Sequence, residues 1–527
     1  MGPTYQGEPS ERDSGAPAPS REPGASPGWR ELTPSVAAAM AALAWGLLLA
    51  PRGYAEGDGS ELTVALALGG VPHPTGYPLY TLGGHVVTSL LHAVGVSWPV
   101  AANAWSALGS AVAVFFLARV ASALAGRDSR SPLPARGLVG ALAVIVSLLA
   151  LIAQPIWNNA AAGAEVYSWH AAWVSAAAWL ALRLATRAEA GPLQGRAWLA
   201  WGLALGVGLA HHATSLLVSL PLTLWLLRRA APVGARGAAA LVTGAGLPLL
   251  SWGWIAYRAS HPAAFQWPLL EPGLRGLLNH VAGRVYGGYI GGFHPSEADA
   301  RLLVTGIPWL LLAFAATLAA AGSRAGGLGR SFVRVLVVAM AGQALFVLAY
   351  RVPDPSAHLL PILALGTASI PPLALRLARR AGTAVTALAA AALLLILLPA
   401  AIARDVAARA EAEETERVVR AAWNGIPFEH GLVAWNNDLY ARLRAYQLLE
   451  GSHPDRIVEN PGVLSWEGPL RRFRDRHGFD PWDGAPPQSE DALFGLAASA
   501  ARAGRMPAID FDDAIRAARA GGWPPTR

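Results

Sequence analysis

Residues 56–80 read EGDGSELTVALALGGVPHPTGYPLY, and this stretch comes soon after the first long apolar segment of the chain. It places two carboxylates, Asp58 and Glu61, and one histidine, His73, between very apolar segments. A carboxylate close to a bilayer is costly and is usually either paired or functional. The prolines that follow stiffen the chain, and the glycine between them allows a sharp turn.

The spacing of the two acids has two interpretations. If a helix begins after Asp58, that residue is an N-cap and Glu61, three residues on, completes a capping box. Alternatively, one carboxylate is a general base at the membrane surface and the other is its partner. The residues of this stretch alone leave both interpretations open.

The composition predicts a membrane protein. Hydrophobic residues make up 54% of the 527 residues and charged residues only 14%, against roughly 25% in soluble domains. Eleven apolar segments recur, and about 20 apolar residues suffice to cross the hydrocarbon core. We therefore predict an all-α polytopic membrane protein with about eleven transmembrane helices. The segments are residues 34–51, 99–118, 137–157, 161–182, 197–211, 213–228, 238–257, 302–321, 331–350, 357–375 and 382–403.

Arginine placement predicts the orientation. Residues 79–95 are apolar but shorter and interrupted by glycine and histidine, so we expect a re-entrant or juxtamembrane helix there. With that assignment every arginine-rich loop falls on one side, which the positive-inside rule makes cytoplasmic together with the N-terminus. The net charge of +7 therefore reflects topology and not nucleic-acid binding. The arginine-rich loops are residues 119–136, 183–196, 228–236, 324–334 and 376–380.

Three regions are expected. Residues 1–33 are rich in Pro, Gly and Ser and predict a disordered cytoplasmic tail, and residues 34–403 form the transmembrane domain. Residues 404–527 predict an extracytoplasmic soluble α/β domain, which begins with a charged helix. The turn at residues 157–161 faces the same side. The chain has no cysteine, which excludes disulfides, thiol nucleophiles and cysteine metal sites.

The opening stretch resembles a bacterial membrane-protein family whose eukaryotic relatives are protein O-mannosyltransferases, within the glycosyltransferase C (GT-C) superfold. That family shows Asp-Ser-Gly-Glu and His-Pro-Pro-Gly-Tyr-Pro-Leu-Tyr. This chain has Asp58-Gly59-Ser60-Glu61 and, in residues 73–80, HPTGYPLY. Later segments are similar in the expected order, so that the resemblance covers most of residues 36–465. They supply Glu165 and Tyr167, His212 and Thr214, Asp354, and the tail YQLLEGSHPDRIVEN.

The resemblance implies an enzyme that takes a sugar from a polyprenyl-phosphate sugar and passes it to an acceptor hydroxyl, inverting the anomeric centre. Asp58 is then the general base and Glu61 its partner. Cationic or hydrogen-bonding groups are needed for the phosphate leaving group. The candidate donor and phosphate ligands are His73, Tyr77, His212 and Arg351, and the candidate sugar ligands are Glu165, Tyr167, Asp354 and His358.

The expected partners are the polyprenyl-phosphate sugar, the lipid bilayer and a protein, glycan or lipid acceptor. Neither a cofactor nor a metal is expected, and the expected location is the bacterial inner membrane, with the site and the C-terminus outside the cytoplasm. Other roles stay open: a transporter or flippase of lipid-linked sugars, or an inactive scaffold. Three site residues also have structural explanations, since His212 could cap a helix, Asp354 could form a turn, and Arg351 could reach lipid headgroups.

Overall fold

The computed structural model describes residues 29–54, 57–127, 133–230, 232–322, 327–352, 354–436, 439–482, 486, 495–502 and 506–520. Most of the predicted tail, residues 1–28, lies outside the described residues. The first nineteen elements are all helical: α1 (Trp29–Leu49), α2 (Gly59–Leu68), α3 (Pro78–Ala93), α4 (Trp98–Arg127), α5 (Leu133–Ile152), α6 (Pro155–Ala162), α7 (Tyr167–Ala188), α8 (Gly195–His211), α9 (Ser215–Arg229), α10 (Ala235–Leu249), α11 (Trp252–Ser260), α12 (Gly273–Val281), η1 (Arg284–Tyr289), α13 (Glu297–Ala321), α14 (Leu328–Ala349), η2 (Pro355–Leu359), α15 (Leu360–Thr367), α16 (Ile370–Ala381) and α17 (Thr383–Gly425).

The chain is a multi-pass membrane protein. Each of the eleven predicted apolar segments forms a helix or a pair of consecutive helices. Among the described residues six helices are long and apolar enough to cross a membrane, or up to eight if each of two bent pairs is one span. The count of eleven spans therefore stays a prediction.

One local prediction is wrong. Residues 157–161, predicted as a turn, are helical and belong to α6, and the turn comes after Ala162. Pro155 explains the difference, because a proline at the first helical position starts a helix with its φ already fixed. The pair α5 and α6 is bent by 71° at this break.

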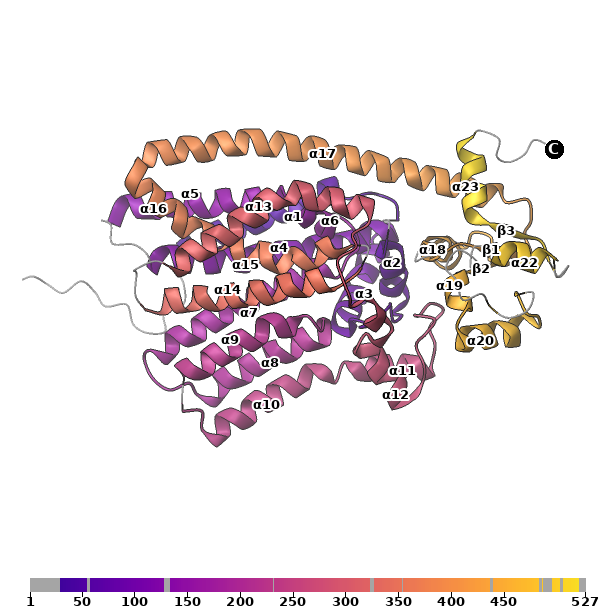
Figure 1. Cartoon of the computed structure of the whole chain (residues 1–527), viewed down its shortest axis with the longest axis horizontal. Coiled ribbons are helices and arrows are strands. Elements are labelled where there is room, and N and C mark those ends of the chain that lie inside the picture. The colour runs from indigo at the N-terminus through magenta and orange to yellow at the C-terminus, as the bar shows by residue number, and fades with distance from the viewer. Residues whose placement is uncertain are drawn as a thin grey trace, which may run out of the picture.

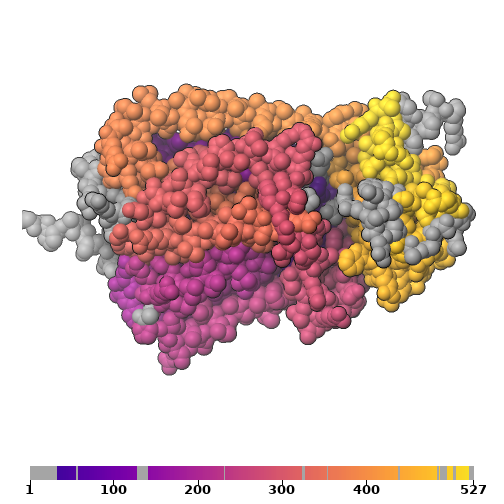
Figure 2. Space-filling view, in the orientation of Figure 1, coloured from indigo at the N-terminus to yellow at the C-terminus, as the bar shows by residue number. Residues whose placement is uncertain are grey.

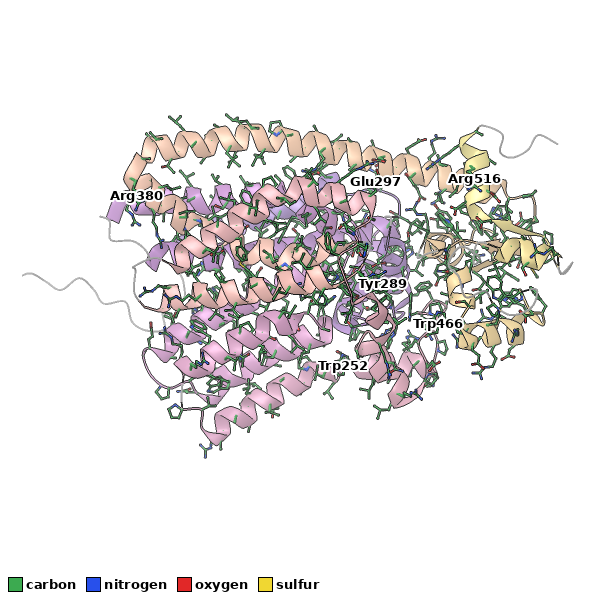
Figure 3. All side chains as sticks on the ribbon, viewed as in Figure 1. Trp252, Tyr289, Glu297, Arg380, Trp466 and Arg516 are labelled. Atoms are coloured by element: carbon green, nitrogen blue, oxygen red, sulfur yellow. The ribbon has the colours of Figure 1, made fainter. Side chains whose placement is uncertain are left out.

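The helices form an elongated bundle with two chemically different ends. Arg380, from one of the arginine-rich loops, lies at one end, and Tyr289 lies at the other (Figure 3). The short elements α2, α3, α11 and α12 gather at the Tyr289 end, beside the C-terminal domain (Figure 1). The predicted re-entrant or juxtamembrane helix corresponds to α3, whose Val86 and Leu90 side chains are exposed.

The bundle core is built from alanine, leucine and tryptophan. Trp198 and Trp201 are among its largest fully buried side chains. Close helix contacts depend on glycine: a Cβ atom at Gly202 of α8 would overlap the carbonyl oxygen of Leu241 in α10. Small residues at such contacts are typical of membrane helix pairs, because they let two backbones approach closely.

The C-terminal residues fold around a small parallel sheet. The strand order is β2-β1-β3, with Val433 of β1 aligned with Val458 and Ile509. The predicted domain boundary at residue 404 lies inside α17, which stays helical to Gly425. This domain caps one end of the bundle (Figure 2). Its elements are β1 (Gly431–Ala434), α18 (Tyr440–Glu450), β2 (Arg456–Glu459), α19 (Pro461–Leu464), α20 (Glu467–His477), α22 (Leu496–Arg502), β3 (Ala508–Asp510) and α23 (Phe511–Arg519).

Candidate active site

The turn after α2 brings His73 back to Asp58 and Glu61 at the start of that helix. α2 ends at Gly69, whose backbone is left-handed (φ 58°), and Gly76 also has a positive φ of 80°. Glycine adopts these conformations without the steric cost that a Cβ atom imposes. Pro78 then begins α3 at its first turn. The turn therefore folds residues 70–77 back along α2.

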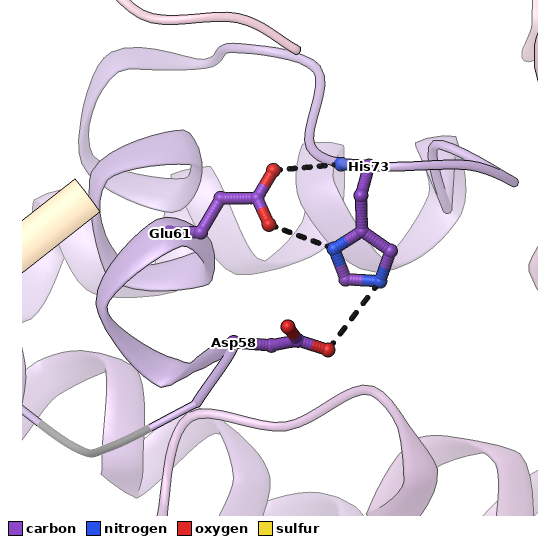
Figure 4. A group of neighbouring side chains, drawn as sticks. All are labelled: Asp58, Glu61 and His73. Carbon is purple, nitrogen blue, oxygen red and sulfur yellow. Dashed lines mark hydrogen bonds and ion pairs between the residues drawn. The ribbon is translucent and has the colours of Figure 1, made fainter. Parts of the chain in front are cut away.

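Asp58, Glu61 and His73 form one cluster, in which hydrogen bonds join Glu61 to His73 and an ion-pair contact joins His73 to Asp58 (Figure 4). The backbone N–H of His73 donates to Glu61 Oε1 at 2.8 Å, and His73 Nδ1 lies 2.8 Å from Glu61 Oε2. The other ring nitrogen, Nε2, lies 3.6 Å from Asp58 Oδ2. Both oxygens of Glu61 are thus used to hold His73, and the imidazole faces Asp58.

This geometry decides between the two interpretations of the acids. Asp58 occupies the N-cap position of α2, but its side chain makes no capping hydrogen bond to the helix. The Glu61 carboxylate accepts from His73, so no capping box forms. The capping interpretation is therefore wrong, and the two acids serve the histidine cluster instead.

The cluster is buried except at Asp58. Glu61 is 2% exposed and His73 is 7% exposed, whereas the Asp58 side chain is 26% exposed. Burial alone would lower the pKa of His73, but Tyr77, Asp58 and Glu61 together raise it well above its ordinary value of 6.5. The neighbouring acids thus favour the protonated imidazole, and the accessible group beside it is the Asp58 carboxyl group.

Tyr77 links this cluster to a second group of predicted residues. Its hydroxyl oxygen lies 3.1 Å from His73 Nε2, and its ring stacks on that of His212 with centroids 5.9 Å apart. Tyr167 lies within 5.8 Å of His212 and 5.2 Å of His358, measured between ring centroids. The structure thus brings five predicted residues from four separate segments into one wall of aromatic and imidazole rings.

Glu165 also belongs to this site. Its backbone N–H donates to Ser106 Oγ at 2.8 Å, which fixes the link between α6 and α7. Among the described residues its side-chain Oε2 is buried without a hydrogen-bond partner. Burial raises the pKa of Glu165 well above its ordinary value, and the charges of Asp58 and Asp354 add to the rise.

Arg351 and Asp354 are the predicted residues that lie outside the buried wall. Both are exposed, and the backbone N–H of Arg351 donates to the Tyr289 carbonyl oxygen at 2.6 Å. Among the described residues, no ion pair or side-chain hydrogen bond joins either of them to the cluster. They stand at the rim of the site.

Several residues near the cluster were not predicted as site residues. Trp267 and Tyr286 present their rings edge-on to His73, with centroids 6.2 and 6.5 Å away. His280 packs against Gly76, and burial lowers its pKa to about 3. His170 lies 5.1 Å from His212 between ring centroids, and its Nδ1 has no partner among the described residues. Only the spacing of His170, three residues after Tyr167, offered a signal, since helix residues three apart share a face.

One group among the described residues has the composition of a metal site. Asp58, Glu61 and His73 each offer one ligand atom, and these atoms lie within 4.8 Å of one another. Both oxygens of Glu61 already accept hydrogen bonds from His73, so a metal would have to replace these bonds.

Structure comparison finds two solved structures with a distant similarity to this chain. One is the archaeal oligosaccharyltransferase AglB from Archaeoglobus fulgidus, in complex with an inhibitory peptide and a dolichol-phosphate. It is 11% identical, the match covers 82% of this chain and 65% of AglB, and the TM-score is 0.46. The other is ArnT from Cupriavidus metallidurans bound to undecaprenyl phosphate, at 15% identity, with 84% and 92% covered and a TM-score of 0.45. This chain spans just under two thirds of the length of AglB.

Sequence comparison finds one family model that is similar to part of the chain. No curated protein sequence matches the chain. Residues 58–232 match the family model of the protein O-mannosyl-transferase TMEM260 N-terminal domain. The match begins at Asp58 and includes Glu61, His73 and His212. The matched part of the chain, with the acidic cluster at its start, is therefore similar to protein O-mannosyl-transferase TMEM260 N-terminal domains, the kind of family that the opening motif resembles.

Proposed function

We propose that this protein is a membrane glycosyltransferase, which moves a sugar from a polyprenyl-phosphate sugar to an acceptor hydroxyl. The observation that carries the proposal is the Asp58–Glu61–His73 cluster, which presents one accessible carboxyl group beside a buried imidazole. The family match over residues 58–232 supports the reaction class, and protein O-mannosylation is the form of the reaction that it favours.

Asp58 is the proposed general base. Its side chain is the most accessible of the cluster, and His73 fixes its direction from 3.6 Å away. The acceptor O–H proton passes to the Asp58 carboxylate as the acceptor oxygen forms its bond to the anomeric carbon. The bond between that carbon and the phosphate oxygen breaks on the opposite face, so the configuration inverts. A positioned base of this kind contributes roughly 10²–10⁴-fold to a rate.

Glu61 is the proposed partner of the base. It holds His73 through the ring and the backbone at once, and His73 in turn orients Asp58. Because Glu61 of α2 bonds both the backbone N–H and the ring of His73 in the turn, the His73 side chain has little rotational freedom. Orientation of this sort lowers the entropic part of a reaction barrier.

The leaving phosphate needs positive charge and hydrogen-bond donors. Protonated His73 supplies the charge nearest the base, and Tyr77 and His212 extend the polar wall. Arg351 at the rim is the proposed contact for the lipid phosphate as it departs. Such preorganised groups stabilise the charge that develops in the transition state.

The sugar is proposed to lie against the second group of residues. Glu165 and Tyr167 have the polar atoms to bind sugar hydroxyls, and the unpartnered Oε2 of Glu165 is free to accept one. His358 lies edge-on to the Tyr167 ring, and Asp354 stands at the rim.

The proposed location follows from the two ends of the bundle. The Arg380 end carries an arginine-rich loop, so the positive-inside rule assigns it to the cytoplasm. The cluster and the C-terminal domain at the other end are then extracytoplasmic, in the inner membrane of a bacterium. This is the side on which we propose that the lipid-linked donor meets its acceptor.

Sugar transfer by the purified full chain in lipid vesicles tests the proposal. Radiolabelled polyprenyl-phosphate mannose, glucose and arabinose are supplied with acceptor-containing extract, and both the labelled product and released polyprenyl phosphate are measured. Asp58→Asn should lower turnover at least ~100-fold, because the amide cannot take the proton. A chelator should leave wild-type turnover within about twofold, since we propose that no metal takes part.

Asp455→Asn is the matched control, because this aspartate is exposed on the C-terminal domain. It should transfer sugar at the wild-type rate. Equal turnover by Asp58→Asn and wild type would remove Asp58 from the mechanism. Failure of the wild type with every donor would reject the transferase and favour transport or a scaffold.

A further inference from the structure

The helix that carries Glu61 is shared between two hydrophobic cores. Leu62 and Leu66 of α2 pack in the core of the helix bundle, with residues such as Tyr77. Val64 and Ala65 of the same helix pack in a second core. All nine residues from Gly59 to Ala67 are buried. α2 is therefore packed on two sides. The second core is the contact that supports it from outside the helix bundle.

Most of the second core comes from the C-terminal domain. It joins Val64, Ala65 and Tyr54 to residues of α17, α18, β1 and β2, more than 350 positions later in the chain. Figure 1 shows α18 beside α2 at the junction between bundle and C-terminal domain. The C-terminal domain thus packs directly against α2. A change in the packing of this domain therefore also changes the support of α2.

Arg442 is the polar anchor of this junction. The residue is 2% exposed, and its guanidinium Nη2 donates to the backbone carbonyl oxygen of Tyr54 at 3.2 Å. A buried cation is costly unless its donors are used. Tyr54, also 2% exposed, precedes Asp58 by four residues. Arg442 therefore ties the C-terminal domain to the backbone that leads directly into the site.

Aromatic and ionic contacts also join the C-terminal domain to the segment around Tyr54. The rings of Tyr54 and Tyr446 meet edge to face with centroids 5.6 Å apart. The guanidinium carbon of Arg420, on α17, lies 4.3 Å from the centroid of Tyr446, and Arg420 pairs with Glu450 at 2.5 Å. α17 and α18 are therefore locked to each other where they hold Tyr54.

Gly53 shows how closely α17 lies against this segment. A Cβ atom at Gly53 would lie only 2.8 Å from the Cγ atom of Glu416 on α17. Tyr54 is therefore enclosed between the last membrane helix and the C-terminal domain.

We propose that the C-terminal domain is a positioning element of the site, in which Arg442 and Tyr446 hold Tyr54 and α2 and so fix Asp58 and Glu61. This role rests on the proposed transferase function. It does not require the C-terminal domain to touch donor or acceptor. Misplacement of a reacting group by about 1 Å can cost roughly 10²-fold in rate, so a support at this distance from the chemistry has a measurable effect.

Two measurements on Arg442→Leu in the full chain test the proposal. Amide hydrogen exchange reports whether α2 is loosened, and sugar transfer reports whether the site is disturbed. We expect faster exchange in α2 and unchanged exchange in α13 and α14. We expect kcat to fall about 10²-fold while KM for the donor stays within about twofold, because substrate contacts remain.

Two further variants serve as controls for Arg442→Leu. Arg442→Lys keeps a buried cation that can donate one hydrogen bond, so it should show smaller changes in both measurements and serves if the leucine variant does not fold. Arg516→Leu, on α23, is the matched control: its side chain is 71% exposed and pairs with Asp513 on the same helix. It should match wild type in both measurements.

The outcomes separate the positioning role from the transferase function. Wild-type exchange in α2 of Arg442→Leu, with an active wild type, would overturn the positioning role alone. Faster exchange with unchanged kcat would overturn it as well, because the site would then tolerate the loss of support. If the wild type transfers no sugar, the proposed function fails and the positioning role fails with it, whatever the exchange shows.

Discussion

Two segments between long helices, residues 57–78 and residues 350–359, both carry charged residues that the sequence predicted for the site. In the first, Glu61 and His73 are buried and bonded to each other within twelve residues of chain. In the second, Arg351 and Asp354 are exposed, and the buried residue is His358. Equally polar sequences thus ended in different environments.

The difference lies in how each segment is held. Within residues 57–78 the turn is held against α2 by a contact inside the same segment, because Glu61 accepts hydrogen bonds from His73. Residues 350–359 are held from a distant helix: Asp299 of α13 accepts hydrogen bonds from the backbone N–H and the hydroxyl of Ser356. A locally closed cluster suits reacting groups that need fixed geometry, and a rim held from elsewhere suits groups that contact substrate.

The largest difference between the two segments is expected in kcat. Glu61→Gln removes the charge that holds His73, so kcat should fall about 10²-fold, which corresponds to about 2.7 kcal/mol in the barrier. Asp354→Asn should leave kcat unchanged and raise KM for the donor less than about tenfold, since it loses only a rim contact. Steady-state transfer kinetics measure both, and equal losses of kcat in the two variants would break the comparison.

The next effect concerns packing. Gly76→Ala should lower the free energy of unfolding by about 2 kcal/mol or more, because φ is 80° and the new Cβ would lie 2.9 Å from both His280 Nε2 and Ile255 Cδ1. Gly288→Ala, in η1, is the control, since nothing lies within 4 Å of its Cβ position. Thermal unfolding in detergent should separate the variants, and matching midpoints would show that the turn is not tightly packed.

The smallest expected effect is the pH dependence of stability. Because the pKa of His73 is raised in the folded protein, the stability from its charge is complete below about pH 6.5 and is lost as pH rises through the folded pKa. One proton contributes at most about 1.4 kcal/mol per pH unit. Unfolding midpoints measured from pH 6 to 9.5 should fall less steeply in His73→Asn than in wild type. A wild-type slope in His73→Asn would show that this histidine is not the group that titrates.

The acids that follow the first apolar segment could be predicted because they stand out in an apolar chain. Asp58, Glu61 and His73 are close in sequence, and turn residues between them allow the chain to fold back. Their mutual contact needs only one helix and one turn. Sequence spacing therefore carried most of the information about this part of the site.

The rest of the site depended on contacts between distant segments. Trp267, Tyr286 and His280 approach the turn from the loop before α13, and no spacing rule places them there. The same applies to Tyr54 and Arg442, which are 388 residues apart and joined by one hydrogen bond. Such pairs are set by how helices pack and not by local preference.

Composition and spacing alone predict a multi-pass helical membrane protein with a charged turn soon after its first apolar segment. The physical reason is that the bilayer requires long apolar helices, makes charge expensive and sorts arginines by side, so each feature leaves a local signal. Only the tertiary structure decided that Asp58 and Glu61 serve His73 and do not cap α2. It also decided that the C-terminal domain shares a core with α2, because burial on two sides depends on packing between segments far apart in the chain.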